Sequence, residues 1–259
     1  KRDFVFSSPV STPFERNNQV HGKIFRCKGG EQPLRTVILL HGWNAEWTYS
    51  VLFPPVARLL LGAHINVAII ELPYHAHRKP RGGPGVVRNF ISEDLGCMVE
   101  ATSQAIADTR ALVQWLRDHG STSIGVWGFS LGAWIAGLVA CSERDLDLAV
   151  LATPVVNVER VIAELPFCAP IRRSLASNRI PLDRLSLLSH QPLLDRRNLL
   201  LLESAHDLFV PAETVEDLWH RWGEPQIWRV PHGHISIWLA PRLLAQVTKW
   251  IASVMTGPK

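Results

Sequence analysis

The sequence predicts an α/β fold in which a mostly parallel β-sheet is covered by helices on both faces. Short runs of valine, isoleucine and leucine alternate along the chain with longer segments of helical periodicity, which is the order that such a sheet requires. The runs are apolar throughout, as is typical of strands buried on both sides. With 259 residues, 47% of them hydrophobic, the chain is long enough to bury one large core. We therefore expect residues 1–259 to form a single domain.

Eight segments are expected to form strands. The first two, residues 4–6 and 20–25, mix apolar and polar side chains, as strands near the edge of a sheet do. The six apolar runs that follow occupy residues 37–40, 67–70, 124–127, 148–151, 199–202 and 227–230. Because helical segments connect these six runs, we expect most neighbouring strands to be parallel.

Helical periodicity is clearest in two segments. Residues 103–119 place apolar side chains at helical spacing and are followed by Gly120, which readily takes the left-handed conformation that ends many helices. Residues 242–255 follow Pro241 and carry one apolar face. Residues 154–197 interrupt the alternation, since they contain five prolines and no clear strand. We expect a small helical cap insertion there.

Composition and charge exclude several classes of function. The formal net charge is +4 and no long run of lysine or arginine is present, so the sequence predicts no nucleic-acid partner. The longest apolar runs are too short to cross a bilayer, which predicts no membrane span. The chain starts at Lys1 without a hydrophobic signal segment, and the sequence leaves cytoplasmic and secreted locations open, as it does the oligomeric state.

The cysteines and histidines do not indicate a metal site. The four cysteines, at positions 27, 97, 141 and 168, are widely spaced and form neither a Cys-x-x-Cys pair nor a zinc-ligand pattern. Buried free thiols are the favoured interpretation, and two disulfides are the alternative if the protein is exported. His75 and His77 lie in a loop without a nearby Cys or Asp. We expect them to line a pocket or pack the loop, and we expect no metal and no cofactor.

The pentapeptide Gly-Phe-Ser-Leu-Gly at positions 128–132 is the most informative motif. It lies between the apolar run 124–127 and a helical pattern that begins at Ala133. A sharp strand-to-helix turn would expose the serine hydroxyl, and the glycines matter because a Cβ at either position would clash with neighbouring backbone. Ser130 is therefore the expected nucleophile. At the start of the helix, the Leu131 N–H is a candidate donor to a developing oxyanion.

A serine hydroxyl needs a histidine to accept its proton and an acid to orient that histidine. Asp207 fits the acid, because it comes shortly after the run 199–202, and Glu203 is the alternative. His232 and His234 both follow the last apolar run and precede the terminal helix. We favour His234 as the base because the preceding glycine relaxes the backbone and lets the loop reach the serine.

A second oxyanion donor is expected in the turn after the run 37–40. The sequence there is His41-Gly42-Trp43, and the Trp43 N–H is the natural donor. His41 precedes Ser130, which is the wrong order for the base, so we expect its ring to support the turn by hydrogen bonding. The side chains of Trp47, Phe129 and Trp134 are expected to add aromatic surface near the site.

Together these segments resemble the α/β-hydrolase superfamily over residues 35–253. Within it, the chain is similar to serine carboxylesterases and to α/β-hydrolase domain proteins whose loop reads like Leu-Pro-Tyr-His at positions 72–75. In that fold the nucleophile, acid and base follow each other along the chain in the order found here.

The resemblance implies ester hydrolysis through an acyl-enzyme. Because the expected cap is short and the sequence contains no long apolar lid, we expect small or short-acyl esters as substrates. Ser130 would attack, His234 would shuttle protons, Asp207 would orient it, and the N–H groups of Leu131 and Trp43 would stabilise the oxyanion. A peptidase, thioesterase or acyltransferase with the same residues, or a non-catalytic binding protein on this fold, are the alternatives.

Overall fold

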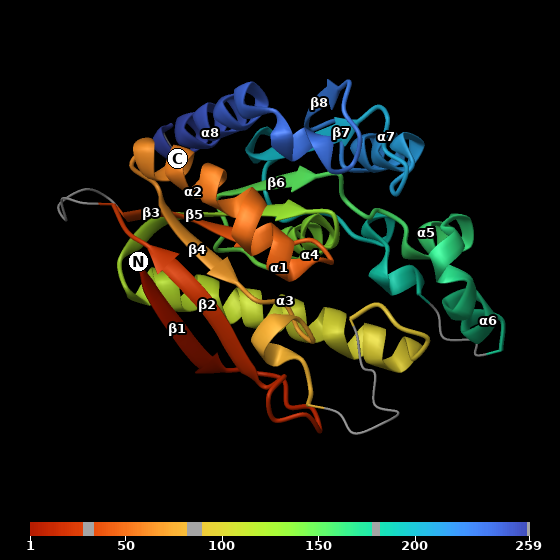
Figure 1. Cartoon of the computed structure of the whole chain (residues 1–259). Coiled ribbons are helices and arrows are strands. Elements are labelled where there is room, and N and C mark those ends of the chain that lie inside the picture. Colours follow the sequence, from red (N-terminus) through yellow and green to blue (C-terminus); the bar gives the residue numbers. More distant parts are fainter. Residues whose placement is uncertain (28–33, 82–89, 178–181, 258–259) are drawn as a thin grey trace.

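The computed structural model describes residues 1–27, 34–81, 90–177 and 182–257 (Figure 1). In this part of the chain, eight strands form one sheet in the order β1-β2-β4-β3-β5-β6-β7-β8. β2 pairs antiparallel with β1 and β4, and all other pairs are parallel. The strands are β1 (Arg2–Ser7), β2 (Gln19–Phe25), β3 (Leu34–Leu40), β4 (Asn66–Ile70), β5 (Ser121–Phe129), β6 (Leu148–Ala152), β7 (Leu199–Ser204) and β8 (Gln226–Val230). The predicted mostly parallel sheet is confirmed.

Helices cover both faces of this sheet. Helices α2 and α8 pack on one face, whereas α3, α4 and α7 pack on the other. The described α-helices are α1 (Ala45–Trp47), α2 (Phe53–Gly62), α3 (Leu95–Asp118), α4 (Leu131–Ala140), α5 (Val158–Glu164), α6 (Ala169–Ser177), α7 (Ala212–Arg221) and α8 (Pro241–Thr256). Each strand of the centre is thereby shielded from water on both sides.

Successive side chains of the central strands enter opposite halves of the core. In β3, Val37 and Leu39 face α2 and α8, while Ile38 and Leu40 face α3 and α4. All four are 0% exposed. Because side chains alternate between the faces of a strand, a strand covered on both faces needs an apolar residue at every position. This explains the uninterrupted apolar runs in the sequence.

The structure extends one predicted helix. Helix α3 begins at Leu95 rather than at residue 103, and the Asp94 side chain caps it by accepting a hydrogen bond from Cys97 N at 2.9 Å. Leu95 and Met98 are buried on the same face as the later apolar residues. Gly96 and the neighbouring polar residues weaken the apolar pattern of these first turns, so the helical periodicity of the sequence did not include them.

Residues 154–197 contain helices and no strand in their described part, which leaves out residues 178–181. Helices α5 and α6 and several short 3₁₀ turns follow the end of β6, and Figure 1 shows α5 and α6 projecting beyond the sheet at that end. The expected helical content is present. This segment, the β6–β7 insertion, stands beside the site described below.

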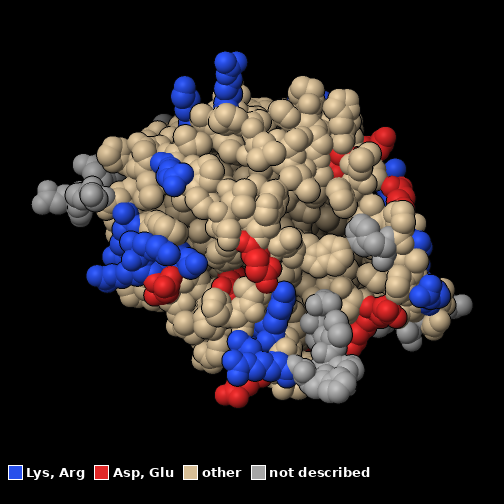
Figure 2. Space-filling view, in the orientation of Figure 1, with Lys and Arg blue, Asp and Glu red and all other residues tan. Residues whose placement is uncertain are grey.

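Surface charge, helix hydropathy and the state of the cysteines bear on the expectations drawn from composition. On the face drawn in Figure 2, basic side chains form separate groups among acidic ones and uncharged surface. No described helix has the length and apolar character needed to cross a membrane. All four cysteines lie in described segments and none forms a disulfide. Cys97 and Cys168 are buried and the other two are partly buried.

Candidate active site

Ser130 occupies the turn between β5 and α4. Its φ and ψ angles are 53° and −115°, a left-handed conformation that is costly for a residue with a side chain. The Ser130 N–H donates a hydrogen bond to Ala152 O at 2.9 Å, which ties the turn to the end of β6. A Cβ on Gly128 would overlap the backbone of Gly132, and one on Gly132 would overlap the backbone of Leu40. Both glycines are therefore required by close backbone contacts, as the motif predicts.

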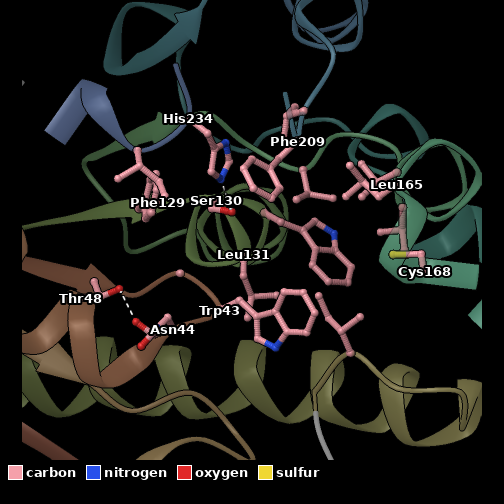
Figure 3. A pocket seen from close by; sticks show the side chains of 18 of the residues that line it. Trp43, Asn44, Thr48, Phe129, Ser130, Leu131, Leu165, Cys168, Phe209 and His234 are labelled. Atoms are coloured by element: carbon pink, nitrogen blue, oxygen red, sulfur yellow. Dashed lines mark hydrogen bonds between the residues drawn. The ribbon is translucent and has the colours of Figure 1, made fainter. Parts of the chain in front are cut away.

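His234 connects Ser130 to Asp207. The distance from His234 Nε2 to Ser130 Oγ is 2.8 Å, and that from His234 Nδ1 to Asp207 Oδ2 is 2.7 Å. A carboxylate only accepts hydrogen bonds, so Nδ1 carries the proton and Nε2 is left to accept from the serine hydroxyl. The side chains of His234 and Asp207 are 9% and 2% exposed. Figure 3 shows the His234 ring directed at Ser130.

The orientation of Asp207 is set by the backbone that follows it. Its Oδ1 accepts hydrogen bonds from the N–H groups of Phe209 and Val210, each at 2.8 Å. These bonds leave Oδ2 directed toward the imidazole. The ring centroids of Phe129 and Phe209 lie 5.2 and 5.0 Å from that of His234, so aromatic packing also restrains the imidazole. The carboxylate and the imidazole are thus held before any ligand arrives.

His232, the alternative base, connects two loops through its backbone carbonyl. His232 O accepts a hydrogen bond from His206 N at 3.0 Å, and Ala205 N donates to Val230 O at 2.9 Å. These two bonds join the loop after β7 to the loop after β8. They bring the loop that carries Asp207 to the loop that carries His234, and the His234 ring is the one within hydrogen-bond distance of Ser130.

The alternative acid, Glu203, lies away from the imidazole. It is 5% exposed on β7, and its carboxyl interacts with Glu216 of α7, which pairs with Arg229 of β8. Burial raises the pKa of Glu203 to about 7, and the hydrogen bond with Glu216 acts in the same direction. Although Glu203 lies near the end of a strand, its carboxyl is not at the surface, because α7 covers this end of β7.

Both candidate oxyanion donors lie at the same cavity as Ser130. Leu131 is the first residue of α4, so its N–H has no partner within the helix, and the helix dipole favours negative charge beside it. Trp43 follows β3, and both residues line the cavity together with Ser130. In the view of Figure 3, the labels of both residues lie below Ser130.

His41 supports the turn that carries Trp43. The ring is fully buried, its Nε2 accepts a hydrogen bond from Leu72 N at 2.9 Å, and its Nδ1–H donates to Gly42 O at 2.7 Å. Burial holds the pKa of His41 well below its ordinary value, so the ring is neutral. Its contacts agree with the supporting role expected from the sequence.

The cavity beside Ser130 has a volume of about 240 Å³ and an almost entirely apolar lining. Trp43, Trp47, Phe129 and Trp134, the aromatic residues singled out from the sequence, all line it. Figure 3 shows Ser130 and His234 on one side of the cavity and Leu165 and Cys168 on the other. The β6–β7 insertion supplies that far wall through Val155, Val158, Val161, Ile162, Leu165 and Cys168.

Sequence reasoning did not identify these wall residues. They lack a motif, because any apolar side chain of suitable size can line a cavity.

In the described segments, no group of three or more His, Cys, Asp or Glu side chains is arranged to hold a metal ion.

Solved structures with the same fold include esterases. The chain is 21% identical to an esterase of Pyrococcus furiosus, with a TM-score of 0.67 over 96% of this chain and 91% of that one. It is 13% identical to an acetyl xylan esterase of Paenibacillus sp. R4, with a TM-score of 0.69 over 95% of this chain and 88% of that one. At these identities the likeness shows the fold, which is that of the α/β hydrolases.

Sequence comparison places the chain in a family. An uncharacterized protein of Mycobacterium tuberculosis is 35% identical over 176 residues, which make up 66% of this chain and 42% of that protein. The chain thus spans less than half the length of the curated relatives it matches. Residues 20–171 match the family described as alpha/beta hydrolase domain containing 18. This match includes the Ser130 turn and covers more than half of the chain, which therefore belongs to that family.

Proposed function

We propose that this protein is a serine carboxylesterase that hydrolyses small or short-acyl carboxylic esters through an acyl-enzyme. One observation carries the proposal: a single imidazole lies within hydrogen-bond distance of both the Ser130 hydroxyl and the Asp207 carboxylate. A hydroxyl, an imidazole and a carboxylate connected in this order can generate a serine nucleophile at neutral pH.

In the first half-reaction, Ser130 Oγ attacks the ester carbonyl carbon while its proton passes to His234 Nε2. Asp207 stabilises the resulting imidazolium through its hydrogen bond to Nδ1. The carbonyl oxygen becomes an oxyanion, which the N–H groups of Leu131 and Trp43 are proposed to bind. The imidazolium then gives its proton to the alcohol oxygen, the ester C–O bond breaks, and the acyl group stays on Ser130.

In the second half-reaction, water takes the place of the alcohol. His234 accepts a proton from the water while the water oxygen attacks the acyl carbon. The same two N–H groups bind the second oxyanion. When the intermediate collapses, His234 returns the proton to Ser130 Oγ and the carboxylic acid leaves. The neutral imidazole is restored for the next cycle.

The cavity supports an uncharged substrate with an apolar group. Its lining offers few polar groups apart from the reacting side chains, so a charged acyl or alcohol group would lose its hydration without a compensating partner. The cavity is also bounded on its far side by the β6–β7 insertion. These features favour small aliphatic esters.

A fluorophosphonate probe and a panel of nitrophenyl esters test this function. The probe should label the wild-type protein at Ser130 and should not label Ser130→Ala. Nitrophenyl esters of increasing acyl length should be hydrolysed by the wild type, with the highest kcat/KM among the short chains. Folded wild-type protein that neither reacts with the probe nor hydrolyses any ester would instead support a binding protein on this fold.

A further inference from the structure

Trp134 is a large buried side chain beside the nucleophile. It lies on α4, and its backbone N–H donates a hydrogen bond to Ser130 O at 3.0 Å, so the two residues are one helical turn apart. Side chains on a helix lean toward its N-terminus, so the indole is directed back toward the turn that carries Ser130. The ring is 1% exposed and lines the cavity. It therefore belongs to the surface that a substrate bound to Ser130 would meet.

The indole of Trp134 also bonds to the β6–β7 insertion. Its Nε1–H donates a buried hydrogen bond to Leu185 O at 2.6 Å. The next two residues hold Leu185 in place, because Ser186 Oγ and Leu187 N both donate to Val156 O, at 3.1 and 2.9 Å. Val156 lies at the start of the insertion, between residues of the apolar far wall. The indole is thus held between α4 and the insertion.

Close packing makes the indole a fixed part of the cavity wall. The ring of Phe90 lies edge-on to it, with the ring centroids 6.2 Å apart and an angle of 71° between the planes. Phe90 is itself buried. A ring that is closely packed and hydrogen-bonded through its only polar atom cannot turn aside without losing both kinds of contact. The indole therefore sets the depth of the cavity at this place.

The two ends of the cavity differ in exposure. His234 must give its proton to the alcohol oxygen, so the alcohol group of an ester lies on the side of the imidazole. Phe209, which packs on that imidazole, and Ile235, which follows it in the chain, line the cavity and are 41% and 45% exposed. The lining residues Trp134 and Cys168 are almost fully buried. The buried end of the cavity is thus left for the acyl group.

We propose that Trp134 is a specificity-determining residue, which limits the length of the acyl group by closing the buried end of the cavity. This inference rests on the proposed esterase function. The hydrogen bond to Leu185 keeps the indole across that end. The alcohol group faces the more exposed end, so its length is not limited by this ring.

The substitution Trp134→Leu tests this role with nitrophenyl esters. Leucine is smaller than tryptophan and apolar, so the change opens the buried end without adding a polar group. Each CH₂ group that gains room should raise kcat/KM about fourfold. Room for two of them should raise the hexanoate-to-butyrate ratio of kcat/KM about 15-fold above that of the wild type.

Trp222→Leu is the matched control. Trp222 is also a buried tryptophan that bonds to the insertion, since its Nε1–H donates to His190 O at 3.1 Å, but it does not line the cavity. The same substitution there removes a bond to the insertion without opening the cavity, so the hexanoate-to-butyrate ratio should stay at the wild-type value. An equal rise of the ratio in both variants would show that loosening of the insertion changes the acyl preference, which would overturn the proposal.

Acetate esters of increasing alcohol length separate the two ends of the cavity. In Trp134→Leu, the ratio of kcat/KM for hexyl acetate to that for butyl acetate should equal that of the wild type, because the alcohol end is unchanged. A change in this ratio would show that the indole bounds the alcohol group, and it would overturn the assignment of Trp134 to the acyl side.

If Trp134→Leu does not fold, Trp134→Phe replaces it. Phenylalanine keeps a ring against Phe90 but is smaller than the indole, so room for about one CH₂ group should raise the hexanoate-to-butyrate ratio about fourfold. A folded variant of either kind that keeps the wild-type ratio would refute the role of Trp134. Failure of the esterase proposal is recognised separately and earlier, because the wild type itself would then neither hydrolyse esters nor react with the fluorophosphonate.

Discussion

At the scale of single residues, the geometry of the site depends on which atoms of each side chain already form hydrogen bonds within the protein. Asp207 uses Oδ1 for two backbone N–H groups and Oδ2 for His234, so the imidazole is oriented without any contribution from a ligand. A second acidic residue, Glu203, lies four positions earlier in the chain and serves a different purpose. Its carboxyl is buried under α7 beside Glu216.

Replacing Asp207 by asparagine should lower kcat strongly. The amide nitrogen can donate to Nδ1, which favours the ring with its proton on Nε2, so the tautomer with a free Nε2 that proton transfer needs would be lost, as would the negative charge that stabilises the imidazolium. In a comparable serine-histidine-aspartate site this change costs about 10⁴-fold, and we expect a decrease of about 10³–10⁴-fold in kcat with nitrophenyl acetate. Glu203→Gln is the control and should keep its kcat. A decrease of less than tenfold in Asp207→Asn would refute the assignment of the acid.

Glu203 should make stability depend on pH. Its pKa is raised from 4.5 to about 7 in the folded protein, so the folded state holds this proton more tightly than the unfolded chain does. Glu203 therefore favours folding below pH 4.5, and that contribution disappears as the pH rises to about 7. Glu203→Gln stays uncharged throughout this range.

Thermal unfolding between pH 4.5 and 8 measures the effect of Glu203. Across that window the Tm of the wild type should fall by several degrees relative to that of Glu203→Gln, because a pKa raised from 4.5 to about 7 corresponds to a loss of up to about 3 kcal/mol. A Tm difference that stays constant across the window would show that Glu203 does not titrate there.

At the scale of secondary-structure elements, the turn between β5 and α4 depends on close backbone approach. Gly132, the second residue of α4, lies directly against the end of β3, and Gly128, next to the last residue of β5, lies directly against α4. These contacts bring the turn of Ser130 and the turn of Trp43 to the same edge of the sheet. The strained φ of Ser130 is the local cost of this arrangement.

Substituting Gly132 by alanine should therefore destabilise the fold and lower activity. The new Cβ meets backbone of Leu40, which cannot move aside as a flexible side chain can. We expect a loss of about 2–3 kcal/mol in the free energy of unfolding, measured by urea denaturation. Gly62→Ala in α2 is the control, because its Cβ would meet no atom within 4 Å, and it should be neutral or stabilising by up to about 1 kcal/mol. Equal stabilities of the two variants would contradict this account.

At the scale of the whole molecule, the cavity exists because two distant parts of the chain meet. The carboxyl edge of the sheet supplies Ser130 and His234, and the β6–β7 insertion supplies the opposite apolar wall. The wall includes Cys168, which is 2% exposed and lies across the cavity from Ser130. The size of the side chain at this position should limit how long a substrate group can be.

Filling the cavity at Cys168 should shift the preference toward shorter esters. Each buried CH₂ group contributes about 0.8 kcal/mol, so the loss of room for two of them in Cys168→Trp should lower kcat/KM by about 15-fold. The decrease should appear for nitrophenyl butyrate and not for the acetate, whereas Cys168→Ala should keep the wild-type ratio. An unchanged acetate-to-butyrate ratio in Cys168→Trp would show that the acyl group does not reach this wall.

The extent of sequence-based prediction differed between the fold and the site. The eight strands and the terminal helix were predicted near their observed positions, because burial on both faces leaves a continuous apolar run in the sequence. The start of α3 was predicted too late, because Gly96 and its polar neighbours obscure the apolar spacing of the first turns. The burial of Glu203 was missed, because the helix that covers it follows later in the chain.

By itself, the sequence determined the order of the strands and helices along the chain, singled out Ser130 and Asp207, and favoured His234 over His232, since a glycine-flanked serine and late loop residues are local signals. Only the tertiary structure shows which of the two histidine rings lies within hydrogen-bond distance of the serine and which apolar side chains line the cavity. The physical reason is that hydrogen bonds and packing act over a few ångströms through space. Residues that are far apart in the chain leave no pattern that records such contacts.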